Sequence, residues 1–163
     1  VEPQRLGGII LAWRNHVDIR RYMYTQQEIG MAEHRAWFAN ARTNGNQNLF
    51  IYERNDEALG FMNLTRTRFA GVADWGFYLA PDAPKGCGHE LGQLALNYAF
   101  NHLDYYKVCG QALAFNERSI AFHKRLGFTQ EGCLVKQHYD GQDYHDVICF
   151  GLLKSDWLQS AQE

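Results

Sequence analysis

A glycine-rich segment between an aromatic run and an amphipathic stretch has the residue types to bind an anion. Residues 76–92 read GFYLAPDAPKGCGHELG, in which Gly86 and Gly88 flank one cysteine and Lys85 adds a positive charge. The first turn of a helix offers unpaired N–H groups and the positive end of the helix dipole, and glycine lets an anion approach that backbone. The segment therefore predicts a pyrophosphate-binding loop, with a plain turn before a helix as the alternative.

Other phosphate-binding and metal-binding motifs do not fit the sequence. The spacing is GxGxxxG, whereas dinucleotide-binding folds use GxGxxG, and little strand–helix alternation surrounds this mid-chain segment. A Walker loop would end in Gly-Lys-Ser or Gly-Lys-Thr, which the loop lacks. The seven histidines show no spacing typical of metal ligands, so we expect no metal site.

The hydrophobic pattern predicts the elements that must position this loop. We expect helices over 9–27, with a break near Asn15 and His16, and over 88–103 and 117–127. Thr25 and Glu28 form a capping box, which predicts another helix that begins there and ends at the turn residues 43–47. Alternating or apolar runs predict strands at 49–54, 58–69, 72–79, 107–115, 128–139 and 144–153. Strands that come together first and alternate with helices later indicate an α+β fold with a mixed sheet.

Composition narrows the class of protein. A chain of 163 residues, 46% hydrophobic and 21% charged, fits a single domain over residues 1–163. The net charge of −2 gives no basic field for nucleic acid or an anionic membrane, and no apolar run is long enough to span a bilayer. The four cysteines contain no CxxC pair and lie mostly in strand-like runs. We therefore expect free thiols rather than disulfides, and so a cytoplasmic protein.

A second segment about thirty residues downstream, NERSIAFHKRLGF at 116–128, extends the interpretation of the loop. Together the two segments resemble the GNAT superfamily of acetyl-CoA-dependent N-acetyltransferases. In that family a strand leads into a Q/R-x-x-G-x-G/A loop, and a later Asn precedes a helix that ends in Gly-Phe. The loop pattern falls on residues 83–88, where Ala83 replaces the Gln or Arg and both glycines match. The resemblance covers essentially the whole chain. It implies a twisted, mostly antiparallel mixed sheet flanked by helices, with acetyl-CoA as co-substrate.

The resemblance also implies which residues bind acetyl-CoA. The strand backbone would bond the pantetheine arm, the loop N–H groups would hold the pyrophosphate, and the later Asn and Lys would contact the arm and a phosphate. These residues are Phe77, Tyr78, Leu79, Lys85, Gly86, Cys87, Gly88, His89, Asn116 and Lys124. For Lys124, a solvated helix face is the alternative.

Acyl transfer to an amine needs a neutral amine, a stabilised oxyanion and a proton for the departing thiolate. The family usually places a Tyr four residues before the Gly of the Gly-Phe ending, and this sequence has His123 there. A neutral imidazole can donate a proton, so His123 is a candidate general acid, with a half-buried helix residue as the alternative. Backbone N–H groups of the Tyr78 strand can face the thioester oxygen. No base is evident, and a water ordered by Asn63 could relay the amine proton.

A narrower resemblance concerns the acceptor. Residues 13–26, WRNHVDIRRYMYTQ, and 32–38, AEHRAWF, look like the amino-sugar N-acetyltransferases of pseudaminic acid biosynthesis. Those enzymes acetylate the 4-amino group of UDP-4-amino-4,6-dideoxy-N-acetyl-β-L-altrosamine. The resemblance implies that Arg14, His34, Thr65, Arg66 and Tyr78 bind a nucleotide sugar, since Arg suits a diphosphate through bidentate bonds. On the residues alone, Arg14 would be a surface ion-pair residue.

Two other functions fit the same motifs. A ribosomal-protein or peptide N-acetyltransferase would favour an acidic cleft, whereas Arg14, His34 and Arg66 would make this one basic. A non-catalytic acyl-CoA-binding regulator would keep the glycine loop but would need neither His123 nor a nucleotide pocket. The expected partner is a nucleotide-sugar substrate, without nucleic acid or membrane. A homodimer is one assembly that the sequence allows.

Overall fold

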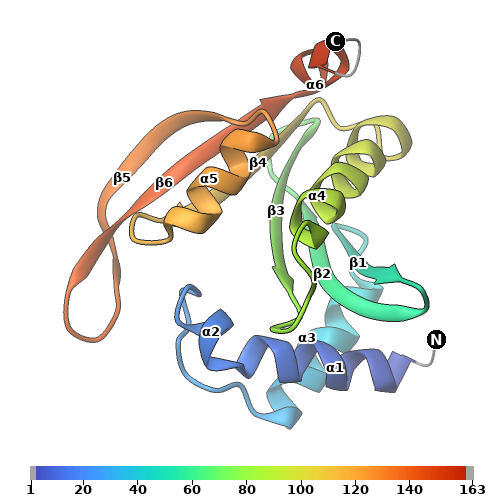
Figure 1. Cartoon of the computed structure of the whole chain (residues 1–163), viewed down its shortest axis with the longest axis vertical. Helices are drawn as coiled ribbons and strands as arrows, with labels where there is room; N and C mark the ends of the chain where they lie inside the picture. The colour runs from blue at the N-terminus through green and yellow to red at the C-terminus, as the bar shows by residue number, and fades with distance from the viewer. Residues whose placement is uncertain (1–2, 161–163) are drawn as a thin grey trace.

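A six-stranded sheet with helices on both faces forms the centre of the protein, as a computed structural model that describes residues 3–160 shows (Figure 1). The strand order is β1-β2-β3-β4-β6-β5. Every neighbouring pair is antiparallel except β3 and β4, which are parallel. This arrangement confirms the expected α+β fold with a mixed, mostly antiparallel sheet.

The six strands form close to the positions that the hydrophobic pattern predicts. They are β1 (Gln47–Arg54), β2 (Glu57–Arg66), β3 (Val72–Leu79), β4 (Lys107–Leu113), β5 (Thr129–Tyr139) and β6 (Tyr144–Leu153). Strand β3 shows the alternation clearly, because Ala73 and Trp75 are buried while Asp74 and Gly76 are exposed. The two sets of side chains therefore face opposite sides of the sheet.

Two groups of helices cover these two sides. The helices are α1 (Pro3–Asn15), α2 (Val17–Arg20), α3 (Met31–Thr43), α4 (Cys87–Asn97), α5 (Glu117–Arg125) and α6 (Lys154–Ser160), and a π-helical turn (Tyr98–His102) extends α4. Helices α4 and α5 cover the face that carries Trp75, and α1 and α3 lie towards the opposite face (Figure 1). Helix α6 was not expected from the sequence. No helix between residues 3 and 160 is long and apolar enough to cross a membrane.

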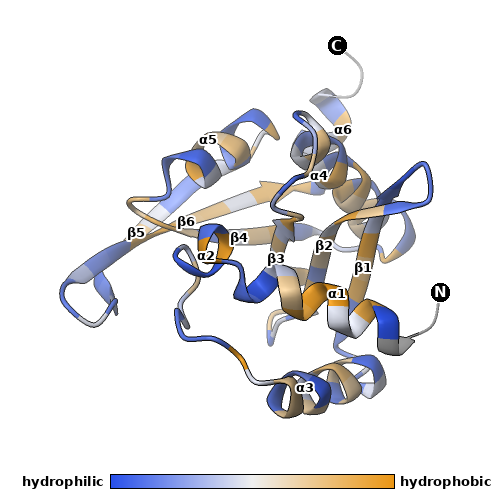
Figure 2. Cartoon of the chain, turned by 60° about the horizontal axis from the view of Figure 1, so that its bottom comes forward, coloured by the Kyte–Doolittle hydropathy of each residue, from blue (hydrophilic) through white to orange (hydrophobic). Residues whose placement is uncertain are grey.

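The main hydrophobic core lies between the sheet and helices α4 and α5. Fully buried side chains from several elements meet there, among them Met62, Leu64, Leu96, Phe100 and Phe150. Hydrophobic residues are concentrated in the central strands and on α1 and α4, whereas the turn between β5 and β6 is hydrophilic (Figure 2). All four cysteines are free, as expected, and one of them, Cys133, is exposed.

The segment between α2 and α3 differs from the expectation. Helix α3 begins at Met31 after Gly30, and not at Thr25. Arg14 donates through Nη2 to the Thr25 carbonyl (2.7 Å). The Asn15 amide accepts from the N–H of Ile29 and donates to its carbonyl (2.8 and 2.9 Å). These bonds hold the residues before α3 against the end of α1, so the capping-box prediction at Thr25 is wrong.

The most consequential feature of the sheet is the separation of β3 from β4. The two strands pair only between Val72–Asp74 and 107–109. Beyond these positions β3 continues with β2 alone beside it, and β4 continues with β6, so the two facing edges are unpaired (Figure 1). The indole of Trp75 and the imidazole of His123 lie against Gly110, the first residue of β4 past the pairing. A Cβ at Gly110 would lie 2.5 Å from both His123 Nε2 and Trp75 Nε1, so this position requires glycine.

We expect Gly110→Ala to lower the free energy of unfolding by about 1–3 kcal/mol, because the added methyl displaces both rings. Gly76→Ala is the matched control, since Gly76 also lies in a strand and nothing lies within 4 Å of its Cβ position. Its effect should stay within about 0.5 kcal/mol. Urea unfolding of the two variants measures both values, and equal destabilisation would contradict the explanation.

Candidate functional site

The loop before α4 has the geometry of an anion-binding site. Gly86 precedes the helix with a left-handed backbone (φ 94°), and nothing lies within 4 Å of its Cβ position. The N–H of Cys87 donates to Pro84 O and that of Glu90 to Gly86 O (3.2 Å each). Within the described part of the chain, the N–H groups of Gly88 and His89 have no acceptor. Two free donors at the positive end of α4 can therefore bind an anion, and Lys85 next to them is exposed.

Two loop residues have structural roles that the sequence did not indicate. Cys87 is fully buried in the core, and its N–H is used inside the loop. Gly88 lies against other elements, since its Cβ position is 3.3 Å from Leu79 Cδ1 and 3.7 Å from the Phe122 ring. Cys87 thus offers neither its thiol nor its N–H to a ligand, whereas Gly88 combines a free N–H with close packing.

The strand edge next to the loop has free backbone groups. Phe77, Tyr78 and Leu79 lie on β3 past its last pairing with β4, and β2 bonds them on one side only. Phe77 contacts Phe122 on the α5 side (ring centroids 4.6 Å apart). Tyr78 faces the other side, where its hydroxyl donates to Ile10 O (3.4 Å), and burial raises its pKa. The outer edge of this segment can bond an extended ligand as an added strand would.

Asn116 and Lys124 lie at the two ends of α5, the helix that follows β4: Asn116 directly precedes its first turn, and Lys124 belongs to its last turn. The Asn116 side chain caps this helix, because Oδ1 accepts from the N–H of Ser119 (3.1 Å). Its amide nitrogen has no protein acceptor among residues 3–160 and remains available to a ligand. Lys124 is exposed and forms no ion pair within the same residues.

His123 lies in the core rather than at a surface. It is 1% exposed, Nε2 accepts from the Trp75 indole N–H (3.0 Å), and Nδ1 donates to Ser119 O (2.8 Å). Its ring also stacks on Phe150 (centroids 4.7 Å apart). Burial lowers its pKa, so the ring is neutral at pH 7 with its proton on Nδ1. The ring has no free proton for a departing group, and these contacts favour the buried-residue alternative over a general acid.

Asp74 stands where the strands part, and sequence reasoning missed it. It is opposite Cys109 in the last paired position of β3 and β4, and opposite Thr65 on β2. It forms no ion pair with any described residue. The surrounding protein partly desolvates the carboxylate and raises its pKa, while burial and the Asp74 charge together raise the pKa of the Cys109 thiol. On β2, Thr65 Oγ1 donates to Asn63 Oδ1 (3.4 Å). The alternation of residues along β3 could have revealed this position from the sequence, because it puts Asp74 on the same side of the sheet as Tyr78.

The segment before α3 contacts the same side of the sheet. Tyr24 donates its hydroxyl to Gln111 Oε1 on β4 (2.6 Å), and its ring is 5.4 Å from that of His138 on β5. Burial, with a smaller contribution from Cys149, raises the pKa of Tyr24. These two contacts place Tyr24, which was also missed, over the end of the opening on the β4 side.

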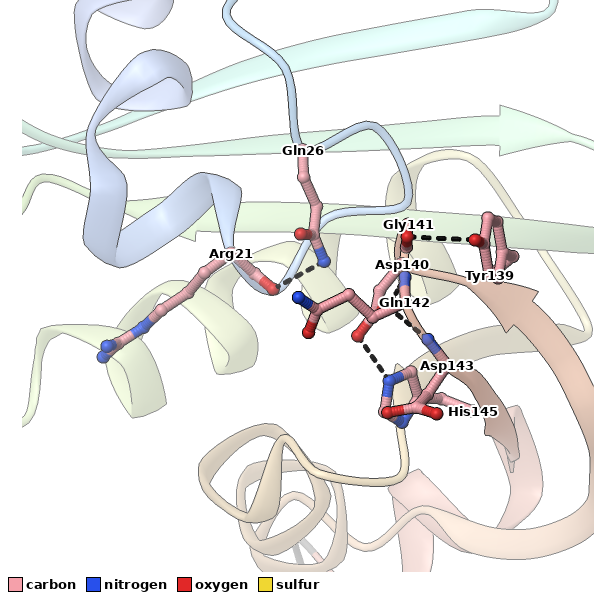
Figure 3. A network of polar contacts seen from close by, with 8 residues as sticks. All are labelled: Arg21, Gln26, Tyr139, Asp140, Gly141, Gln142, Asp143 and His145. Atoms are coloured by element: carbon pink, nitrogen blue, oxygen red, sulfur yellow. Dashed lines mark hydrogen bonds and ion pairs between the residues drawn. The ribbon is translucent and has the colours of Figure 1, made fainter.

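The turn between β5 and β6 is held by one carboxylate (Figure 3). Asp140 accepts from the N–H groups of Gln142 and Asp143 (2.8 Å each) and from His145 Nε2 (2.6 Å). The backbone donors of Asp143 and Gln142, then His145, lower the pKa of Asp140 to about 2. The carboxylate is fully used inside the turn, so it is a structural group rather than a second acidic site.

The expected basic residues do not gather in one place. Arg14 lies beside Tyr78, and burial lowers the pKa of its guanidinium. The Nη1 atom of Arg14 is buried and has no hydrogen-bond partner in the described structure. His34 is 4% exposed and donates through Nε2 to Gly7 O (2.8 Å), which ties α3 to α1. Arg66 is exposed opposite Ala73, five residues from Tyr78 along β3, or about 16 Å at the usual strand rise. The three residues therefore do not form a single basic cluster.

Comparisons with known proteins extend these observations. The sequence profile of the GNAT acetyltransferase domain family matches residues 1–129. An uncharacterized prophage-derived N-acetyltransferase of Bacillus subtilis is 37% identical over 86 residues, which are 51% of this chain and 49% of the relative. A putative ribosomal N-acetyltransferase of the same organism is 31% identical over 86 residues, 52% of this chain and 47% of the relative. The matched segment thus spans about half the length of these two relatives.

A solved structure shows the same fold over nearly the whole chain. The spermidine N-acetyltransferase of Vibrio cholerae, in complex with CoA and spermine, superposes with a TM-score of 0.88 at 21% identity. The superposition covers 97% of this chain and 95% of that chain. It establishes a common fold for the two proteins.

We expect His123→Gln to change the pH dependence of stability. The unfolded imidazole, with a pKa near ~6.5, takes up a proton that the buried native ring does not, so the free energy of unfolding falls as the pH drops below ~6.5. Without this group the slope should become shallower by up to about 1.4 kcal/mol per pH unit. Urea unfolding between about pH 5 and pH 7.5 measures it.

His102→Gln is the control, because it removes an exposed imidazole instead of a buried one. If His123→Gln kept the wild-type slope and stability but lost turnover about a hundredfold, His123 would have to be assigned to proton transfer instead.

Proposed function

The chain belongs to the GNAT acetyltransferase domain family, and from this premise we propose that it transfers an acetyl group from acetyl-CoA to a primary amine. The observation that carries the proposal is the opening between β3 and β4, with an unpaired strand edge along it and free N–H groups of α4 at its end. We further propose that the protein works in the cytoplasm, where its four free thiols would stay reduced.

The residues along the opening fit acetyl-CoA. The pyrophosphate would accept bonds from the N–H groups of Gly88 and His89, in the space that Gly86 leaves open. The amides of the pantetheine arm would bond the free edge of β3 over residues 77–79, as an added strand does. The free amide of Asn116, before α5, would bond the arm, and the exposed ammonium of Lys124, in the last turn of α5, would contact a phosphate. Bound acetyl-CoA supplies the activated acetyl group.

Backbone donors of β3 would stabilise the reacting thioester oxygen. In the proposed pose the thioester lies near the point of separation, where N–H groups past Asp74 face the opening. A fixed donor aimed at a developing oxyanion contributes about 3 kcal/mol to transition-state stabilisation. Because α4 and α5 fill the other side, the acceptor amine would approach from the face that α1 and α3 cover.

Asp74 makes that approach selective for a cationic amine. A carboxylate without an ion pair attracts an ammonium group, and its raised pKa suits it to accept the proton that the amine must lose. Water ordered by Asn63 and Thr65 would relay the proton where the amine does not touch Asp74 directly. Two of the similar proteins are named for spermidine and ribosomal acetylation, and spermidine is a cationic amine. We therefore propose a polyamine or a peptide amine as acceptor.

A UDP-amino sugar is the second candidate acceptor. One observation favours it: the buried Nη1 of Arg14, beside Tyr78, has no acceptor among the described residues and could bond a phosphate oxygen. The separation of Arg14 from Arg66, and the use of His34 Nε2 by Gly7, weaken it. A non-catalytic acyl-CoA-binding regulator would share the glycine loop but would have no use for the Asp74 carboxylate.

We expect Gly86→Ala to weaken CoA binding about tenfold, because its methyl would stand in the phosphate space and strain a left-handed backbone. Gly141→Ala is the matched control, since Gly141 also has a left-handed φ (103°) and open space at its Cβ position. Calorimetric titration with CoA measures both variants. Equal affinities for CoA in the two variants would remove the phosphate-loop assignment.

We expect Asp74→Asn to lower kcat/KM for the acceptor at least about a hundredfold while CoA affinity stays unchanged, because the amine loses its anion and proton acceptor. Asp156→Asn, which removes an exposed carboxylate on α6, is the control. Spermidine, a peptide with a free N-terminal amine and the UDP-amino sugar should be tested side by side.

The same assay separates the two acceptor classes. If only the UDP-amino sugar reacts, UDP alone competes with it, and Arg14→Gln raises its KM about tenfold, the acceptor is a nucleotide sugar. If the protein binds acetyl-CoA but acetylates none of these amines, the proposed enzyme activity is replaced by the assignment as a non-catalytic acyl-CoA-binding regulator.

A further inference from the structure

We propose that a pocket between α1 and α3 binds a small amphipathic anion, at a site separate from the one for acetyl transfer. The pocket has a volume of about 380 Å³, within the range of small-molecule sites. It is bounded by residues of α1 and α3 and contains none of the loop residues before α4 and none of β3. The proposal therefore does not depend on the acetyl-transfer function.

One stripe of α3 forms a wall of this pocket. Its members recur every three or four residues, which is the spacing of one helix face. They are Met31, His34, Arg35, Phe38, Ala39 and Arg42. The facing wall is the pair Gly7 and Gly8 on α1. A charged and aromatic helix face thus lies opposite a helix segment without side chains.

The two glycines have different explanations. Each glycine inside a helix costs about 1 kcal/mol relative to alanine, so each needs a reason. Gly7 has one, because its Cβ position is 3.6 Å from the Phe38 ring and its carbonyl accepts from His34. Gly8 has no atom within 4 Å of its Cβ position and does not have a left-handed backbone. Neither packing nor conformation explains Gly8, whereas the volume that it leaves in the pocket does.

The charges of the pocket favour an anion. Arg35 and Arg42 are exposed, and neither forms an ion pair with a described residue. No carboxylate is among the residues that line the pocket. The Arg42 guanidinium lies 5.9 Å from the centroid of the Phe38 ring, which holds it at the apolar wall. Two guanidinium groups without counter-charges can bond a carboxylate or sulfonate.

His34 adds a buried polar group to the lining of the pocket. Because Nε2 donates to Gly7 O, Nδ1 carries a lone pair, and it has no protein partner among residues 3–160. The side chain is 96% buried, and burial lowers its pKa, so the ring is a neutral acceptor. A ligand with a hydroxyl or N–H group near its anionic end would complete this arrangement.

An apolar extension fits the body of such a ligand. A smaller recess of about 180 Å³ shares Phe38 and Arg42 with the pocket. Its other lining residues are hydrophobic and come from α1, β1 and β2: Leu6, Ile10, Leu49, Ile51 and Phe61. Together, the two recesses can bind both parts of such a ligand. The arginines would contact its anionic head, and the hydrophobic side chains of the smaller recess would contact its apolar body.

Anilinonaphthalene sulfonate, which has an anionic head and an aromatic body, is a direct probe. With saturating CoA to block the phosphate loop, a fluorescence titration of the full chain should show one saturable site. Gly8→Leu should weaken binding at least about tenfold by filling the pocket, and Gly8→Ala should weaken it less. Arg35→Gln and Arg42→Gln should each weaken it about tenfold without touching the helix interior. Decanoate should displace the probe, and decanol should not.

Arg68→Gln is the matched control, because Arg68 is also exposed and lies 5.0 Å from an aromatic ring, that of Phe69. It should leave binding unchanged. Any of three results would overturn the proposal: normal binding by Gly8→Leu and both pocket arginine variants, equal weakening by Arg68→Gln, or displacement by decanol as strong as by decanoate. Light scattering that shows a dimer dissociated by the pocket substitutions would instead assign this surface to a second copy of the chain.

Discussion

The hydrogen bond between the Trp75 indole and the His123 imidazole, 3.0 Å long in the core, is the contact around which the opening in the sheet is organised. It joins β3 to α5 directly over Gly110, the residue of β4 that has no room for a side chain. Past this point the two parallel strands no longer pair, and each keeps one free edge. The free edge of β3 is where an extended ligand can bond, so core packing on one side of the sheet creates the binding geometry.

The two faces of the sheet beside this contact have different roles. On the α5 side, His123 uses both ring nitrogens in the core, and burial keeps it neutral. These contacts favour a structural role for the histidine at this position of the family motif, and its role in proton transfer stays a prediction. On the other side, Asp74 and Tyr24 lie at the two strands that border the opening. Proton transfer in the proposed reaction is accordingly assigned to the face that receives the amine.

Much of the fold could be predicted, because strands and most helices depend on local hydrophobic alternation. The main error was the predicted start of α3, and it shows that a local sequence pattern can be overridden by contacts with more distant residues. Thr25 and Glu28 have the sequence of a capping box, but the Thr25 carbonyl accepts from Arg14, and Glu28 pairs with Arg20 (3.3 Å). Asn15 bonds the backbone of Ile29 on both sides. Contacts across eight to fourteen residues outweighed a capping preference that is worth about 1 kcal/mol.

The sequence by itself determined the glycine loop, the helix that follows it and the helix after Asn116, because each depends on residues close together in the chain. Only the tertiary structure decided which charged groups share a site. It separates Arg14 from Arg66, places Asp74 where the strands part, and sets the arginines of α3 opposite the glycines of α1. Strand register and helix docking set these positions, and both arise from packing between residues far apart in the chain, which no short pattern contains.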